Sequence, residues 1–140
     1  MGKINWGRVF LGGLLAGLVA ILLKSASFVL FGGREWKSAL ETLGRPLQVT
    51  TGFAAFWIVM FFVLGISAVW LYAAIRPRYG PGPKTAICAG IALWFVAALL
   101  PELVFGSMGL FSLRLIAIDV CSYFVILVAA TVVGAWQYKE

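Results

Sequence analysis

The sequence contains no histidine, only two cysteines and few charged residues, which make up 11% of its 140 positions. Histidine is the commonest general base and neutral metal ligand, so the usual centre of both kinds of site is missing. Cys88 and Cys121 lack the CxxC spacing of zinc and redox motifs, and we expect both to be small, buried packing residues at different depths. We therefore expect no catalytic residues, no metal, no disulfide and no cofactor.

The shortage of charge accompanies an excess of apolar residues. Hydrophobic residues make up 63% of the chain and the mean hydropathy is +1.04, whereas soluble domains are about 45–50% apolar and about 25% charged. Too few polar groups are present to cover a soluble fold, and disorder requires low hydrophobicity with high charge. The composition therefore indicates an integral membrane protein, with residues 1–140 forming one transmembrane domain.

Four apolar stretches are long enough to cross a bilayer, for which a helix needs about 20 apolar residues. We predict spans at about residues 9–31, 53–75, 85–105 and 110–136. The first could instead be a cleaved signal peptide, but its apolar run continues through Phe28–Phe31, so we expect a true span. The runs do not alternate as barrel strands do. The predicted fold class is all-α, a polytopic transmembrane four-helix bundle.

The distribution of basic residues predicts the orientation of this bundle. Four spans place both termini on one side, which carries six basic residues against four on the other. The six are Lys3, Arg8, Arg76, Arg78, Lys84 and Lys139, and the four are Arg34, Lys37, Arg45 and Arg114. Basic residues gather at the cytoplasmic edge, so we expect cytoplasmic termini. No basic stripe with interleaved aromatic residues lies outside the apolar runs, so nucleic-acid binding is not expected.

The predicted cytoplasmic loop, residues 76–84, is rich in proline and glycine. Its prolines, beginning with Pro77, are expected to end the preceding helix. Arg76, Arg78 and Lys84 are then predicted to lie at the lipid headgroups, where each such charge contributes about 1 kcal/mol near anionic lipid. We expect a topological stop signal rather than a specific phosphate site, because the P-loop spacing is absent.

The longest predicted outer connection, residues 32–52, contains Trp36, Leu40 and Leu43 at helical spacing between charged residues. This stripe predicts a short amphipathic helix that lies flat at the membrane interface and ends at Gly44-Arg45-Pro46. We expect it to cover the bundle rather than to bind a partner.

Ionisable residues inside the predicted spans are costly unless paired or hydrated, so each marks a candidate site. On the first span, Lys24 shares a narrow face with Gly13 and Gly17, a pair that lets another backbone come close. We therefore expect Lys24 to point toward the same neighbouring helix as the two glycines.

Depth suggests a partner for Lys24 on the last span, where Asp119, Ser122 and Tyr123 share a face. Lys24 and Asp119 lie roughly 10 and 13 Å inside the outer ends of their spans. The matching levels predict a Lys24–Asp119 ion pair, with Ser27, Ser122 and Tyr123 completing its hydrogen bonds. Lys24 could equally snorkel to the outer interface, whereas the short Asp119 side chain cannot reach water.

Two further charges, Glu102 and Arg114, flank the short turn at residues 106–109 and are expected to pair at the outer surface. Pro101 predicts a kink beside them, because it removes a backbone hydrogen bond. A structural clamp explains these residues more simply than a polar pocket open to the outside. The candidate binding residues are Lys24, Ser27, Glu102, Arg114, Asp119, Ser122 and Tyr123.

The leading functional prediction is a non-enzymatic small membrane protein that binds a small amphiphile or lipid, or scaffolds a partner. The alternative is an oligomeric transporter or channel, although no charge ring or broken-helix pair marks a pathway. Small-residue pairs could serve oligomer contacts or internal packing: Gly13/Gly17, Ala86/Gly90 and Ala130/Gly134. A membrane enzyme that uses Glu102 or Asp119 as acid or base lacks a nucleophile or metal. Membrane lipids are the expected partners.

Three stretches carry a resemblance when taken together: residues 5–17, which include Asn5-Trp6-Gly7-Arg8-Val9, residues 70–86 and residues 134–140. The middle stretch, Trp70-Leu-Tyr-Ala-Ala-Ile-Arg-Pro-Arg-Tyr-Gly-Pro-Gly-Pro-Lys-Thr-Ala86, is the most specific. Over most of its length the chain resembles a group of small four-helix bacterial inner-membrane proteins of uncharacterised function. The resemblance implies four helices and a bacterial inner-membrane location, and it assigns no activity and no site residue.

Overall fold

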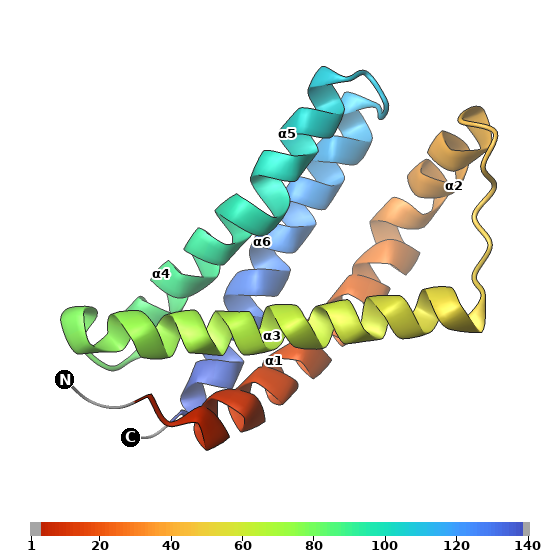
Figure 1. Ribbon diagram of the computed structural model, residues 1–140. Helices are drawn as coiled ribbons and strands as arrows, with labels where there is room; N and C mark the ends of the chain where they lie inside the picture. Colours follow the sequence, from red (N-terminus) through yellow and green to blue (C-terminus); the bar gives the residue numbers. More distant parts are fainter. Residues whose placement is uncertain (1–3, 139–140) are drawn as a thin grey trace.

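The computed structural model describes residues 4–138, and its regular elements in that range are all helical (Figure 1). Four continuous helical segments are long and apolar enough to cross a membrane: Trp6–Thr42, Thr51–Tyr79, Pro83–Ser107 and Leu113–Trp136. This confirms the predicted all-helical class with four apolar helices and suggests a multi-pass membrane protein. Lys3 and Lys139, which contributed to the orientation prediction, lie outside the described residues.

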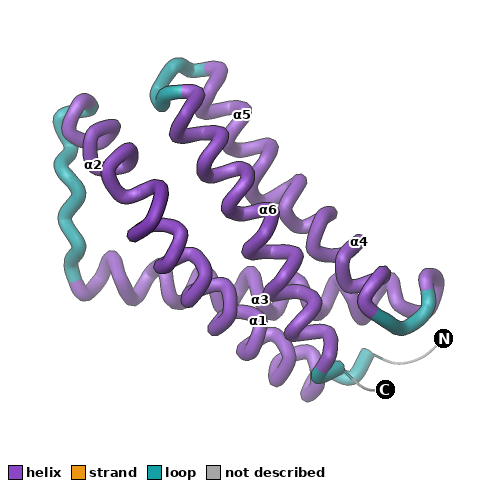
Figure 2. Tube along the Cα trace, turned by 180° about the vertical axis from the view of Figure 1, so that it is seen from behind, coloured by secondary structure: helices purple, strands orange, loops and turns teal. Residues whose placement is uncertain are grey.

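The first segment is one long rod made of α1 (Trp6–Ser27), the π-helical turn η1 (Phe28–Gly32) and α2 (Gly33–Thr42). The Asn5 side chain caps its start by accepting a hydrogen bond from the Arg8 backbone N–H. A short helix is present where one was predicted, but α2 continues α1 instead of forming a separate element after residue 31 (Figure 2). Its position at a membrane interface stays a prediction. No proline interrupts the rod, and Gly32 and Gly33 both keep right-handed helical backbone angles.

The second segment, α3 (Thr51–Tyr79), follows the connection at residues 43–50, which Figure 2 draws as a loop beside α2. The prediction that Pro77 ends this helix was wrong, since Pro77 lies inside its last turn. A proline removes one hydrogen bond from a helix, but it need not stop it. The helix ends instead at Gly80, whose φ of 83° is in the left-handed region.

The third segment consists of α4 (Pro83–Trp94), the π-helical turn η2 (Phe95–Leu99) and α5 (Leu100–Ser107). Pro83 occupies the first turn of α4, where no backbone N–H is required. The wide turn η2 ends two residues before Pro101, and a hydrogen bond from the Leu100 N–H to the Phe95 carbonyl closes it. The expected disturbance at Pro101 thus takes the form of a π-helical turn.

The last segment, α6 (Leu113–Trp136), begins three residues after the predicted start of its span. The Ser112 side chain caps it by accepting a hydrogen bond from the Leu115 N–H. The other three predicted spans lie inside the observed helices.

Glycine allows the helices to approach closely where they cross. A Cβ atom on Gly65 of α3 would collide with the backbone of Gly13 and Gly17 of α1. A Cβ atom on Gly90 of α4 would lie 2.8 Å from the Cα of Val128 in α6. The small residues therefore serve packing within the chain, one of the two uses that their spacing allowed.

The face of α1 that carries Gly13 and Gly17 packs on α3, whereas Lys24 contacts α6. The prediction that all three point toward one neighbouring helix was therefore wrong. Figure 1 shows the reason: α3 runs across α1 at a steep angle and has diverged from it further along the rod.

The far half of the molecule opens away from the crossing point, as both views show (Figures 1 and 2). The beginning of α3 extends to one side, the rod made of α1 and α2 to another, and the pair of α5 and α6 to a third. Large apolar side chains on the first half of α3 are exposed: Phe53, Phe56, Trp57, Ile58 and Val59. Such an apolar surface is suited to contact with lipid rather than water.

Candidate functional site

Three ionisable residues on different apolar segments, Lys24, Glu102 and Asp119, lie at a similar level. Lys24, Glu102 and Asp119 are roughly 27, 28 and 26 Å along their helices from the end nearest the chain termini, at about 1.5 Å per residue. The hydrocarbon core of a bilayer is about 30 Å thick. If that end marks one membrane surface, the three residues form a polar layer just inside the opposite edge of the core.

The centre of this layer is an ion pair between α1 and α6. The Nζ of Lys24 lies 2.8 Å from the Oδ1 of Asp119, so the predicted pair is present and the Lys24 side chain does not simply extend to the interface. Asp119 is only 2% exposed. Its second oxygen, Oδ2, accepts a hydrogen bond of 2.8 Å from the Nε1 of Trp36. Both carboxylate oxygens therefore have a donor, as a buried charge requires.

Trp36 was assigned by sequence reasoning to an interfacial stripe, and its role beside Asp119 was missed. Its ring also packs edge-on against Phe111, with the ring centroids 5.1 Å apart. The one available signal was that an indole N–H normally has a partner when its ring is covered.

The π-helical turn η1 explains why spacing did not predict this contact. Trp36 follows Lys24 by 12 residues, and an α-helix turns by about 100° per residue, so an uninterrupted helix would separate the two side chains by about 120°. A π-helical turn accommodates about one extra residue and so reduces that angle to about 20°. As a result, Lys24 and Trp36 share a face and reach the same carboxylate.

Tyr123, Ser27 and Ser122 surround the ion pair in a different way from that predicted. The Nζ of Lys24 lies 4.1 Å from the centroid of the Tyr123 ring, so Tyr123 contributes the face of its ring rather than a hydrogen bond. The Ser27 hydroxyl donates a hydrogen bond of 2.9 Å to the Ser122 hydroxyl. The two serines therefore join α1 to α6 beside the ion pair without completing its hydrogen bonds.

The predicted pair between Glu102 and Arg114 is absent, which corrects the sequence interpretation. The Nε of Arg114 lies 3.4 Å from the Oε1 of Glu35, because α2 continues beside α6 and brings Glu35 to its level. Glu102 is half-buried on α5 and interacts electrostatically with Asp119 and Lys24. Among residues 4–138, no side chain is within ion-pair distance of it.

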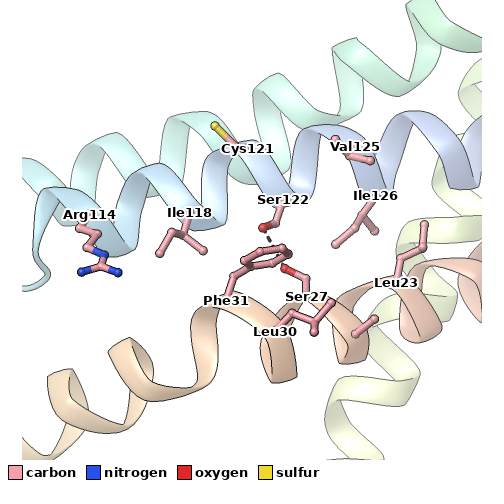
Figure 3. Close-up of a pocket in the computed structure, with 11 residues that line it drawn as sticks. Leu23, Ser27, Leu30, Phe31, Arg114, Ile118, Cys121, Ser122, Val125 and Ile126 are labelled. Atoms are coloured by element: carbon pink, nitrogen blue, oxygen red, sulfur yellow. Dashed lines mark hydrogen bonds between the residues drawn. The ribbon is translucent and has the colours of Figure 1, made fainter.

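A groove of about 590 Å³ runs along the junction of α1 and η1 with α6. Its walls are mainly apolar, and Figure 3 shows the hydrogen-bonded hydroxyls of Ser27 and Ser122 near its middle. Arg114 lies at one end of it (Figure 3), with a side chain that is 77% exposed. The apolar lining residues are Leu23, Ala26, Leu30, Phe31, Ile118, Val125 and Ile126.

Both cysteines are exposed, so the prediction that they are buried packing residues was wrong. Cys121 is one of the residues that line this groove, although its sulfur points away from α1 in Figure 3. Their helices present these side chains outward, where an apolar thiol can face lipid.

The predicted headgroup residues gather at the opposite end of the molecule. Arg76 and Arg78 lie in the last turn of α3, and Lys84 lies in the first turn of α4. The guanidinium carbon of Arg76 is 5.5 Å from the centroid of the Tyr138 ring, whereas Arg78 and Lys84 are exposed. The contact of these three side chains with lipid stays a prediction.

Within the described range, no group of three His, Cys, Asp or Glu side chains is placed to hold a metal ion. No protein-family model matches the chain, and no curated protein or solved structure matches it. The site combines a buried ion pair, an apolar groove and an exposed arginine.

Proposed function

We propose that this chain is a small, non-enzymatic protein of the bacterial inner membrane that binds an anionic lipid in the groove between α1 and α6. Its termini face the cytoplasm, in line with the positive-inside bias of its loops. One observation carries the proposal: an apolar groove of about 590 Å³ ends at an exposed arginine. Apolar walls with a few placed polar groups are typical of small-molecule sites of this size.

The apolar walls match an acyl chain. A methylene moved from water to an apolar surface contributes about 0.8 kcal/mol. A lipid already in the bilayer gains little of this energy, so its preference for the groove over other lipids depends mainly on shape and packing. Ser27 and Ser122 satisfy each other, so the middle of the groove presents no unpaired polar group to an apolar chain.

The position of Arg114 matches a headgroup. It lies roughly 33 Å along α6 from Trp136, at about 1.5 Å per residue, which is beyond the hydrocarbon core of about 30 Å. A guanidinium binds phosphate with two parallel hydrogen bonds, which favours a phosphate-bearing lipid. The Lys24–Asp119 pair holds α1 against α6 and so supports the groove without contacting its occupant.

Replacing Arg114 tests the proposal. Purified protein is titrated in detergent with phosphatidylglycerol, and the bound lipid is counted by native mass spectrometry. Arg114→Gln is expected to lower the retention of this lipid several-fold, because the headgroup loses its cationic partner. The exposed ion pair with Glu35 contributes less than about 1 kcal/mol, so the fold persists.

Arg8→Gln is the matched control, since it removes the same charge from an exposed position near the other end of the molecule that is not among the predicted headgroup residues. Equal retention by wild type and Arg114→Gln, or equal losses in the two variants, would contradict a headgroup site at Arg114.

An oligomeric transporter is a second candidate, favoured by the half-buried Glu102 beside the Lys24–Asp119 pair. Intramembrane carboxylates of this kind often lie on ion or proton pathways. The small-residue pairs give it no support, because they pack within one chain. A monomeric particle mass in lipid nanodiscs would rule this candidate out.

A further inference from the structure

A second groove, of about 380 Å³, lies on another side of the rod, between its outer part and the connection at residues 43–50. Figure 1 shows this connection running beside α2. The apolar lining residues are Phe28, Val29, Pro46 and Leu47, and the charged ones are Arg34, Lys37 and Glu41. None of them belongs to the groove at Arg114.

The three charged residues form one row on α2. Arg34, Lys37 and Glu41 follow one another at steps of three and four, which places them on one face of a helix. All three are exposed. Among the described residues, none of the three forms an ion pair, so the row is available to an external ligand.

The level of the row is that of a headgroup. The rod carries no charged residue between Lys24 and Arg34, where a charged stretch begins. Glu35, next to Arg34, contacts Arg114 of the proposed headgroup level, and the rod diverges from α6, so the boundary between hydrocarbon and headgroups falls close to Arg34 on the rod (Figures 1 and 2). Phe28 and Val29 line the groove on the hydrocarbon side of this boundary, where the chains of a lipid would lie.

We infer that this groove binds the headgroup of phosphatidylethanolamine, with the phosphate at Arg34 and Lys37 and the ammonium at Glu41. The order of charge along the row, two cations and then one carboxylate, is complementary to a phosphate followed by an amine. Phosphatidylglycerol has no cation to place beside Glu41. The choline group carries a charge but no N–H, so it cannot donate the charge-assisted hydrogen bond that an ammonium makes.

Competition among lipids tests this inference. Wild-type protein is incubated in detergent with equimolar phosphatidylethanolamine, phosphatidylcholine and phosphatidylglycerol, and the bound lipids are identified by native mass spectrometry. One phosphatidylethanolamine per chain is expected to be retained at least about three-fold better than phosphatidylcholine. Glu41→Gln is expected to abolish this difference, and Glu41→Asp to keep it. Arg34→Gln combined with Lys37→Gln is expected to lose both of these lipids.

Glu35→Gln is the matched control, because it removes the same charge from the same helix but faces Arg114. It is expected to leave the preference for phosphatidylethanolamine unchanged. A preference that survives Glu41→Gln, or a wild type that does not prefer phosphatidylethanolamine, overturns the inference. Arg114→Gln tests phosphatidylglycerol binding in the other groove. The proposed function and this inference can therefore fail independently.

Discussion

At the scale of single residues, Asp119 joins the helices in the half of the molecule that lies away from the start of α1 and the end of α6. Asp119 lies on α6 and is 2% exposed. Lys24 of α1 and Trp36 of α2 each donate a hydrogen bond to one of its carboxylate oxygens, so the residue joins three helices. A buried carboxylate that loses a donor keeps its desolvation cost, so the loss of one partner is more damaging than the loss of both.

A double-mutant cycle checks this account of the ion pair. Lys24→Met is expected to lower the free energy of unfolding in detergent by about 3 kcal/mol, because it strands a buried charge. The double variant Lys24→Met/Asp119→Asn is expected to recover at least about 1 kcal/mol of that loss. Denaturant titration followed by circular dichroism measures each value. Additive losses in the cycle would show that the two side chains are not coupled.

Part of this cluster was predictable from the sequence and part was not. Equal depth and a shared helical face predicted the contact of Lys24 with Asp119. Trp36 and Glu35 were not predicted to reach α6, because the rotation introduced by η1 cannot be read from residue spacing. The predicted partner of Arg114 was wrong because the short helix was expected to lie separately after the first span, whereas α2 continues α1 and brings Glu35 beside α6.

At the scale of elements, η1 sets the rotation between α1 and α2. A π-helical turn behaves as a helix with one inserted residue. Deleting a single residue from it restores an ordinary α-helix and leaves the residues beyond it facing the same way. Inserting one residue after it turns α2 by about 100°.

Two length variants test the role of η1. Deletion of Val29, which is 81% exposed, is expected to change the free energy of unfolding by less than about 1 kcal/mol. Insertion of one alanine between Gly33 and Arg34 is expected to cost about 2 kcal/mol, because Trp36 leaves Asp119 and its bond to a charged group is lost. Trp36 fluorescence, in a variant whose other tryptophans are replaced by phenylalanine, reports the change in surroundings.

The insertion is the more decisive of the two. A variant with the added alanine that keeps wild-type stability and Trp36 fluorescence would mean that the rotation of α2 does not matter for the Asp119 contacts. The deletion serves as its control, because it also changes the length of the rod by one residue.

The positions of the apolar helices were predictable because twenty apolar residues in a row have few other stable arrangements. The residues at which these helices end were harder to predict. Pro77 was expected to stop α3, yet the helix ends at Gly80, where the backbone adopts a left-handed angle. Proline lowers the stability of a helix, but the surrounding contacts decide whether the helix continues.

At the scale of the whole molecule, the helices pack tightly near the chain termini and separate toward the other end (Figures 1 and 2). Glycines let α1 and α3 approach closely where they cross, and the direction in which α3 then leaves α1 is not predicted by the pattern within either helix. The divergence leaves grooves on two sides of the rod, one ending at Arg114 and the other lined by Arg34 and Lys37. This shape suits a protein that holds lipids at its surface.

The central claim is that four helices cross the bilayer with the grooves facing the outside, and site-directed labelling tests it most directly. Single cysteines replace Gln48, Ser107 or Arg78 in a background without Cys88 and Cys121, and intact bacterial cells are treated with a membrane-impermeant maleimide. The account predicts labelling at positions 48 and 107 in intact cells, and at position 78 only after permeabilisation. Labelling of position 78 in intact cells, or of only one of positions 48 and 107, would contradict it.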